Sequence, residues 1–176
     1  VHNINSVLKS LRGMVPPDFE FAYESVAHFK ADHFNKQPKI AKMMGCEPDF
    51  DAYSGKENTP PDNRKPMRTA AGHIHVGWNE DGEDINFQKF EEARAMTRQM
   101  DYVLGVPSVL IDDGAERRGM YGRAVCFRPK SYGAEYRVLS NFWLKTDELK
   151  EWVFNATLQA YNLLMKGVIL EEMVSS

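Results

Sequence analysis

Residues 72–77 alternate polar and apolar side chains, which is the pattern of a β-strand with two chemically different faces. Side chains alternate across a strand, so His73 and His75 point to the same face, roughly 7 Å apart. Ile74 and Val76 point to the opposite face, which suits a hydrophobic core. The glycines at both ends of the segment let neighbouring atoms approach the backbone closely. This strand therefore predicts a sheet with one buried face and one polar face.

Two histidines with this spacing can share one metal ion, or one can bind a metal while the other contacts a ligand of that metal. Taken alone, the pattern is more typical of half-buried, hydrogen-bonded histidines on a strand. Cupins, for which Glu80 would be the next ligand, and zinc amidohydrolases use a similar pair. Both classes need additional histidines downstream, and none of the five histidines follows His75. We therefore disfavour these two classes.

A second cluster lies between residues 115 and 137. This segment contains six arginines and lysines against two glutamates, whereas the whole chain carries a formal charge of −3. Arg128 falls in the strand-like run 124–129, and arginine is suited to bidentate contacts with phosphate. Glu135 and Arg137 alternate with apolar side chains and so share one face. By itself this is the pattern of an ordinary cross-strand ion pair.

In combination, the two clusters indicate a site for magnesium and a nucleotide. Each predicted strand presents functional groups on one face, and the arginines lie near the second strand in sequence. Oxygen ligands and a few imidazoles hold divalent ions, while arginines neutralise phosphate charge.

The composition limits the class of protein. A chain of 176 residues with 43% hydrophobic and 27% charged residues is typical of one soluble globular domain. It has no apolar run near the roughly 20 residues that span a bilayer and no signal-peptide pattern, so we expect a cytoplasmic protein that does not bind membranes. The net negative charge argues against general nucleic-acid binding. Cys46 and Cys126 lack metal-ligand spacing and are interpreted as reduced structural thiols.

Periodicity predicts the remaining elements. The alternation in residues 19–23 predicts a strand with one buried face. Residues 45–66 contain four prolines and are expected to form a long irregular loop, a kind of segment that is often functional. Gly105 and Pro107 are expected to end the helix that precedes them. The predicted helices cover residues 4–11, 30–44, 85–104 and 146–166.

Four stretches of the chain combine into a wider pattern. They are Arg68-Thr-Ala-Ala-Gly-His-Ile-His-Val-Gly, Arg117-Arg-Gly-Met-Tyr-Gly-Arg123, Phe127-Arg128 and Tyr132-Gly-Ala-Glu-Tyr-Arg-Val-Leu-Ser-Asn-Phe-Trp143. Together they resemble the phage-type carboxylate–amine ligases (COOH-NH2 ligases, or amidoligases), which belong with glutamine synthetase and glutamate–cysteine ligase. The resemblance also takes in residues 45–50, so it covers most of the chain between 45 and 143.

The resemblance implies a fold and an activity. The fold would be α+β, with a curved antiparallel sheet of the glutamine synthetase catalytic-domain type, the site on its concave face and helices packed outside. The activity would be ATP-dependent amide or peptide bond formation through an acyl phosphate, with ATP and Mg2+ (or Mn2+) as cofactors. The substrates would be small-molecule or peptide carboxylates and amines. If the protein is phage-encoded, it would act in the cytoplasm of the infected cell, and a homo-oligomer is compatible with the sequence.

The resemblance also assigns roles to residues. His73 and Glu135 would bind the metal, and His75 would lie against the nucleotide phosphates. Arg137 would stabilise the acyl phosphate next to Glu135. The further phosphate or substrate contacts that the resemblance implies are Arg118, Arg123 and Arg128.

One departure from the family pattern affects the acidic ligands. In these ligases an acidic strand of the Asp-Pro-Glu-Phe type lies near the N-terminus, and no such stretch precedes residue 45. Glu47 and Asp49, in Glu-Pro-Asp-Phe, have a similar form and are further metal candidates. We expect residues 1–176 to be a single ligase domain that lacks this N-terminal strand. The alternative is a truncated or degenerate ligase domain that binds a nucleotide or a partner without turnover.

Overall fold

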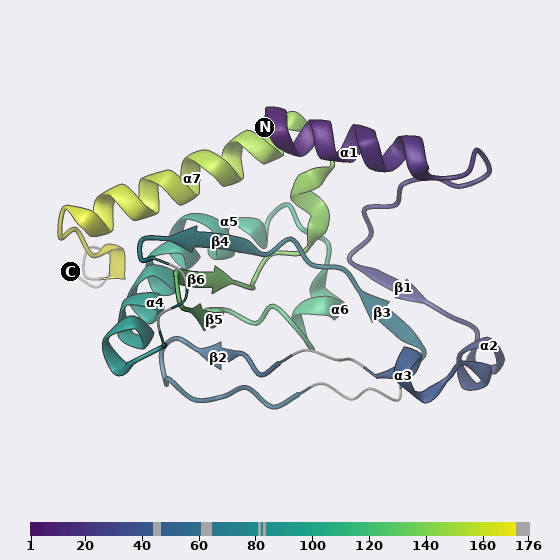
Figure 1. The fold of residues 1–176 in the computed structure, drawn as a ribbon, viewed down its shortest axis with the longest axis horizontal. Coiled ribbons are helices and arrows are strands. Elements are labelled where there is room, and N and C mark those ends of the chain that lie inside the picture. Colours follow the sequence, from purple (N-terminus) through teal and green to yellow (C-terminus); the bar gives the residue numbers. More distant parts are fainter. Residues whose placement is uncertain (44–46, 61–64, 81, 83, 172–176) are drawn as a thin grey trace.

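The computed structural model describes residues 1–171 except 44–46, 61–64, 81 and 83 (Figure 1). It is an α+β structure with two antiparallel sheets, neither of them closed, which confirms the predicted fold class. One sheet pairs β1 (Val26–His28) with β3 (Met67–Thr69), and the other has the strand order β2-β5-β6-β4. The strands of the larger sheet are β2 (Phe50–Asp51), β4 (Ile74–Gly77), β5 (Cys126–Lys130) and β6 (Gly133–Tyr136). Curvature of the glutamine synthetase type stays a prediction.

In Figure 1 the helix of residues 87–100 lies behind the larger sheet, the helices of residues 2–14 and 147–165 lie beyond its β4 edge, and the short helices of residues 31–36 and 39–42 lie beside the small sheet. The long ones are α1 (His2–Met14), α4 (Phe87–Met100) and α7 (Asp147–Met165). The short ones are α2 (Ala31–Lys36), α3 (Lys39–Lys42), the π-helical turn η1 (Asp101–Gly105), α5 (Val106–Ser108), α6 (Ala115–Arg118) and the 3-10 turn η2 (Asn141–Leu144). None of the helices in the described ranges combines the length and the apolar character needed to cross a bilayer.

The main hydrophobic core lies between the larger sheet and the helices α4 and α7. Met96 and Met100 of α4 pack with Tyr136 of β6 and with Val153 and Ala160 of α7. All five side chains are buried. The apolar side chains of these two helices therefore face the core, as expected for amphipathic helices on a sheet.

At Gly72, immediately before the first histidine, atoms of Trp143 and Ser140 approach the backbone closely. The indole Nε1 of Trp143 donates a hydrogen bond to the Gly72 carbonyl, at 3.1 Å. A Cβ atom on Gly72 would lie 2.1 Å from Trp143 Nε1 and 2.5 Å from the carbonyl oxygen of Ser140. The prediction that small residues allow a close approach here is confirmed, because no larger side chain fits this contact.

The strand predicted over residues 19–23 is wrong, because these residues form no strand. Phe21 and Tyr23 instead contact Arg12 of α1. The guanidinium of Arg12 lies 5.7 Å from the ring centroid of Phe21 and donates a hydrogen bond to the hydroxyl of Tyr23. The alternating pattern thus reflects contacts with a helix, while Phe19 is mostly exposed.

The helix predicted over residues 30–44 is divided into α2 and α3. Gln37 has extended backbone angles, which the following Pro38 favours because its ring clashes with a helical preceding residue. Met44 lies outside the described residues. The irregular loop predicted over 45–66 also needs correction, because Phe50 and Asp51 pair with β5 as the short strand β2.

The helix predicted over residues 85–104 begins later and ends later than expected. Its first residue is Phe87, because Asn86 caps it by accepting a hydrogen bond from the Lys89 amide. The chain then continues through η1 and α5 instead of ending at Gly105. Pro107 lies in the first turn of α5, where the missing amide is tolerated. The helices predicted over 4–11 and 146–166 are confirmed as α1 and α7, and Thr146 caps α7.

Candidate functional site

The polar residues of the larger sheet share the face opposite α4. In the antiparallel register, His75 of β4 lies opposite Glu135 of β6, and Glu135 lies opposite Arg128 of β5. Opposed residues of neighbouring strands have their side chains on the same face. The next residues in each strand, Val76 and Tyr136 among them, pack in the core on the other face. The predicted alternation of polar and apolar faces is therefore confirmed for these strands.

Glu135 is the centre of this polar cluster. Its Oε1 lies 2.9 Å from Nδ1 of His73 and forms an ion pair with Nη1 of Arg137. Its Oε2 lies 3.2 Å from Nη1 of Arg128 and 3.2 Å from Nζ of Lys130. Burial alone would raise the pKa of Glu135, but the hydrogen bond with His73 and the charges of Arg137 and Arg128 hold it well below its usual range. The carboxylate is therefore ionised, and cationic side chains compensate its negative charge at both oxygens.

Arg137 connects Glu135 to a second carboxylate. Its Nε donates a hydrogen bond to Oδ2 of Asp49, at 3.1 Å, and its side chain is almost fully buried. Although burial opposes the charged form, the two carboxylates raise the pKa of Arg137 above its usual value. The other oxygen of Asp49 accepts a hydrogen bond from Nδ2 of Asn58. The segment that contains Asp49 is thereby fixed against the end of β6.

His73 lies at the edge of the cluster in its neutral form. Partial burial lowers the pKa of His73, and the hydrogen bond to Glu135 offsets this only in part. Since Glu135 is ionised and can only accept, the proton of the neutral ring is assigned to Nδ1. Nε2 then keeps its lone pair, which is the form of imidazole that binds metals or accepts a proton.

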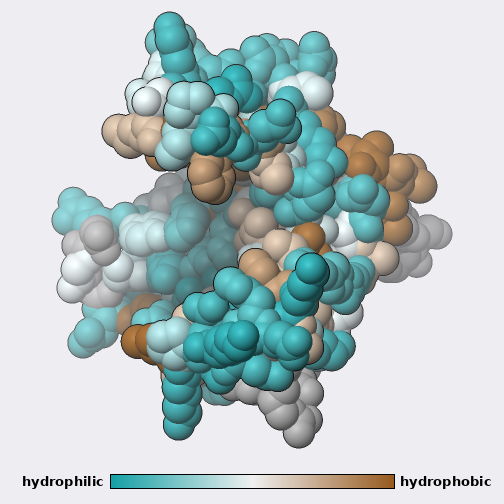
Figure 2. Space-filling model, turned by 90° about the vertical axis from the view of Figure 1, so that its right-hand side faces the viewer, coloured by the Kyte–Doolittle hydropathy of each residue, from teal (hydrophilic) through white to brown (hydrophobic). Residues whose placement is uncertain are grey.

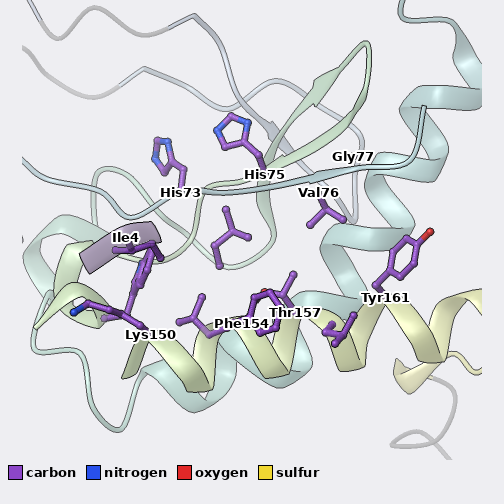
Figure 3. Close-up of a pocket in the computed structure, with 13 residues that line it drawn as sticks. Ile4, His73, His75, Val76, Gly77, Lys150, Phe154, Thr157 and Tyr161 are labelled. Atoms are coloured by element: carbon purple, nitrogen blue, oxygen red, sulfur yellow. The ribbon is translucent and has the colours of Figure 1, made fainter. Parts of the chain in front are cut away.

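His75 lies outside this network of contacts with Glu135. Its exposed ring lies tilted against the ring of Tyr132, with 6.1 Å between the ring centroids, and the two side chains are hydrogen-bonded through Nδ1 and the hydroxyl. Figure 3 shows the rings of His73 and His75 on the side of β4 away from α7, while Val76 points toward α7. The cavity of about 460 Å³ between β4 and α7 is lined mainly by apolar side chains, and the two imidazole rings point away from it.

The other predicted site residues divide into two groups. Arg128 belongs to the cluster, and it also donates to the backbone carbonyls of Glu47 and Pro48. The carboxylate of Glu47 itself is mostly exposed and lies 3.9 Å from Nε of Arg128. Arg123 is exposed and lines a small cavity together with Asp49.

Arg118 is held outside the cluster. Its guanidinium donates to the buried carboxylate of Asp112, at 3.0 Å, and to the Asp112 carbonyl. These bonds fix the C-terminal end of α6, so the structure places Arg118 in a scaffolding position. Its predicted contact with phosphate or substrate stays a prediction.

Lys130 is a cluster residue that the motif analysis did not single out. It lies two residues beyond Arg128 on β5 and therefore on the same face. Applying the alternation of the strand to the whole basic segment would have found it. Cys126, two residues before Arg128, is a buried free thiol, and burial raises the pKa of that thiol to about 12, so it stays protonated. Its interpretation as a reduced thiol is confirmed, whereas Cys46 lies outside the described residues.

The donor types of the cluster fit a divalent ion, but their present arrangement does not complete a site for one. A neutral imidazole and ionised carboxylates are suitable ligands. Among the described residues, however, no group of three or more such side chains surrounds a common point. Glu135 and Asp49 instead face the cationic side chain of Arg137. In this arrangement the cluster is a mostly buried network of three cationic side chains and two carboxylates.

A comparison with protein families gives one match. The model of the phage phiEco32-like COOH.NH2 ligase-type 2 family matches residues 55–168. This range contains the two histidines, β5 and β6, whereas Glu47 and Asp49 precede it. Neither the curated proteins nor the solved structures contain a match to the chain.

Proposed function

Because this chain belongs to the phage phiEco32-like COOH-NH2 ligase family, we propose that it uses ATP to join a carboxylate to an amine through an acyl phosphate. In such a reaction, the carboxylate attacks the γ-phosphorus of ATP, and ADP leaves. The nitrogen of the amine then attacks the acyl carbon, the C–N bond forms, and phosphate and a proton are released. Both steps place negative charge on oxygens, which positioned cations stabilise.

The observation that carries this proposal is the group of three cations around Glu135. Arg128, Lys130 and Arg137 all contact this carboxylate on one open face of the sheet. With Asp49, which pairs with Arg137, the cluster combines three cations and two carboxylates, so the cations exceed the carboxylates by one. Two of the cations lie at neighbouring positions of the same strand face. Phosphate oxygens are suitable additional partners for these side chains.

We assign Arg137 to the acyl phosphate because it is buried, fixed by two carboxylates and adjacent to His73. Arg128 and His75 are assigned to the nucleotide phosphates. Each is a register partner of Glu135 on a neighbouring strand, so all three side chains lie on the same face of the sheet. Lys130 is a new candidate for the same role. Arg123 and Arg118 are retained as more peripheral contacts for phosphate or substrate.

The proposed ligands of Mg2+ or Mn2+ are His73, Glu135 and Asp49, with the exposed Glu47 as a further candidate. When bound, the ion supplies positive charge between the carboxylates and the phosphates. The part played by the chain itself is to keep His73 neutral and Glu135 ionised.

The test uses hydroxylamine as the amine, because it captures an acyl phosphate as a hydroxamate. The chain is incubated with ATP, Mg2+ and a panel of amino acids, dicarboxylates and short peptides, and ADP and hydroxamate are measured. Equal amounts of both products, formed only when a carboxylate is present, are expected. ATP hydrolysis that is independent of carboxylate would contradict ligation.

One observation favours the alternative of binding without turnover. Both oxygens of Glu135 are already occupied by cations, so an ion would have to replace existing partners. The same assay separates the two functions. ATP binding by calorimetry without any ADP formation across the panel would support the alternative, and absence of ATP binding would contradict both.

A further inference from the structure

A buried carboxylate joins the two central strands of the larger sheet from the core side. Asp101 is 7% exposed and directly follows α4. Its Oδ1 accepts a hydrogen bond from the hydroxyl of Tyr136, at 2.7 Å, and one from the amide of Val125, at 3.3 Å. Tyr136 belongs to β6, and Val125 directly precedes β5. One oxygen atom therefore holds both strands.

The two contacts lie next to the charged residues of the cluster. Tyr136 stands between Glu135 and Arg137 in the sequence, and its own side chain is fully buried in the core. Val125 stands three residues before Arg128. A displacement of Tyr136 or Val125 would therefore move the side chains that meet at Glu135.

The backbone at Val125 requires support from its surroundings. Val125 has a φ of +54°, in the left-handed region that β-branched residues rarely adopt. Such a conformation persists only where neighbouring contacts hold it. The bond to Asp101 is one such contact, and the Val125 carbonyl accepts a second from the amide of Ala52, at 3.1 Å. Since β5 begins at the next residue, this conformation sets the path of β5 and the position of Arg128.

The helical segment that carries Asp101 is shaped for the same contact. Asp101 starts the π-helical turn η1, a rare form that often occurs at functional sites. At the other end of η1, a Cβ atom on Gly105 would lie 2.1 Å from Oδ1 of Asp101 and 2.5 Å from the hydroxyl oxygen of Tyr136. Only glycine at position 105 leaves room for the hydrogen bond between these two side chains.

A stable core does not require a carboxylate at this position. Burial raises the pKa of Asp101, although the hydrogen bonds from Tyr136 and Val125 offset part of this effect. Replacing both members of a buried hydrogen-bonded pair by apolar groups of the same shape can be nearly neutral for stability. Leucine and phenylalanine would fill the space of Asp101 and Tyr136, but they would not hold the Val125 amide. The connection between the two strands is what the carboxylate adds.

Asp101 lies away from the side on which a ligand can reach the cluster. Figure 2 views the molecule from the β1–β3 end and shows a hollow in which hydrophilic residues gather. A cavity of about 220 Å³ beside β3 has His73 and Arg137 of the cluster in its wall. Asp101 contacts the strands from the core side instead, through the buried Tyr136. It can therefore act on the cluster only through the strands.

We infer that Asp101 is a positioning residue for the cluster around Glu135. Through Val125 it fixes where β5 carries Arg128, and through Tyr136 it fixes the centre of β6. Without this connection the two strands would shift relative to each other, and the cations would no longer converge on Glu135. The consequence for ATP rests on the proposed function, whereas the arrangement of the cations can be measured without a ligand.

The first test follows the arginines of the free protein by NMR. The Nε–H groups of Arg128 and Arg137 are hydrogen-bonded, so their hydrogens should exchange slowly with water. In the double variant Asp101→Leu/Tyr136→Phe, this exchange is expected to become at least about 10-fold faster. Asp101→Asn keeps an oxygen for both donors and should preserve the slow exchange. Ser108→Ala, which removes a different buried hydrogen bond of the same segment, is the matched control and should also preserve it.

The second test measures the Kd of ATP by calorimetry in a double-mutant cycle. Arg128→Ala and the variant Asp101→Leu/Tyr136→Phe are each expected to raise this Kd about 10-fold. Because Asp101 acts through Arg128, the combination of all three changes should stay within about 3-fold of Arg128→Ala alone. Asp101→Asn and Ser108→Ala should bind ATP like the unchanged protein.

Four outcomes would overturn the inference. Unchanged exchange at both arginines in Asp101→Leu/Tyr136→Phe would show that the cations do not depend on Asp101. Equally fast exchange in Asp101→Asn would show that the acceptor oxygen is not the cause. A matching acceleration at the backbone amides of α7 would indicate a global loss of stability, and additive effects on the Kd of ATP would exclude a route through Arg128. If the arginine hydrogens respond as expected but the unchanged protein binds no ATP, the positioning role holds and the proposed function fails.

Discussion

Nδ1 of His73 lies 2.9 Å from Oε1 of Glu135, although 61 residues separate them in the sequence. The contact forms because β4 and β6 are adjacent in the sheet, and His73 immediately precedes β4. It keeps the imidazole oriented with Nε2 available, as a carboxylate partner does for histidines in metal sites. A structure with these side chains on opposite faces would have contradicted the ligase interpretation.

Replacing Glu135 by Gln should reduce ligation at least about 100-fold. The amide keeps the shape of the side chain but removes the charge that orders Arg128, Lys130 and Arg137. Carboxylate-dependent ADP formation is the measurement. Glu116→Gln, which changes an exposed glutamate on α6, is the matched control and should keep full activity. Turnover in Glu135→Gln within a few-fold of the unchanged protein would refute the central role of this residue.

Arg128→Ala should weaken ATP binding by about 10-fold or more and leave the fold intact. A charge-assisted hydrogen bond to phosphate contributes about 1.5–3 kcal/mol. The affinity is measured by calorimetry and the fold by circular dichroism. The exposed Arg12→Ala is a suitable control, and unchanged nucleotide affinity in Arg128→Ala would count against the assignment.

The protein should lose stability when the pH falls below about 6.5, the ordinary pKa of histidine. Burial lowers the pKa of His73 in the folded state, so the unfolded chain binds more protons in this range. Stability from neutral His73 is therefore present above pH 6.5 and is lost as the pH falls through the lowered pKa. Urea unfolding at pH 7.5 and 5.5 should show a smaller decrease for His73→Asn than for the unchanged protein. The exposed His2→Asn should behave like the unchanged protein, and an equal decrease in all three would rule out this role of His73.

Gly72→Ala should destabilise the protein by about 1–3 kcal/mol, the usual range for overpacking. Its Cβ would overlap Trp143 and the carbonyl of Ser140, so the segment before β4 would have to move. Gly13→Ala is the matched control, because no atom lies within 4 Å of the added carbon and alanine favours the helix α1. Urea unfolding of both variants tests the prediction. Equal stability of the two variants would show that the contact with Trp143 does not restrict the size of the residue at position 72.

The sequence alone determined the helices and strands whose polar and apolar residues repeat with a clear period. The apolar stripes of α4 and α7 and the alternation in β4 and β6 follow from residues within one segment, so the choice of buried and polar faces could be predicted. It also identified most of the polar cluster, because two strands carry charged or imidazole groups on alternate positions. Residues 19–23 show the limit of this reasoning, since helix contacts and strand pairing produce the same alternation.

Only the tertiary structure determined which charged side chains contact one another. The order β2-β5-β6-β4 places Arg128 and His75 on opposite sides of Glu135, and no local pattern specifies strand order. The family resemblance implied a phosphate or substrate contact for Arg118 and none for its neighbour Arg117. In the fold Asp112 neutralises Arg118, while Arg117 is buried among carbonyl groups, because adjacent residues of a short helix point in different directions. The partners of these two side chains therefore depend on packing between segments that are distant in sequence.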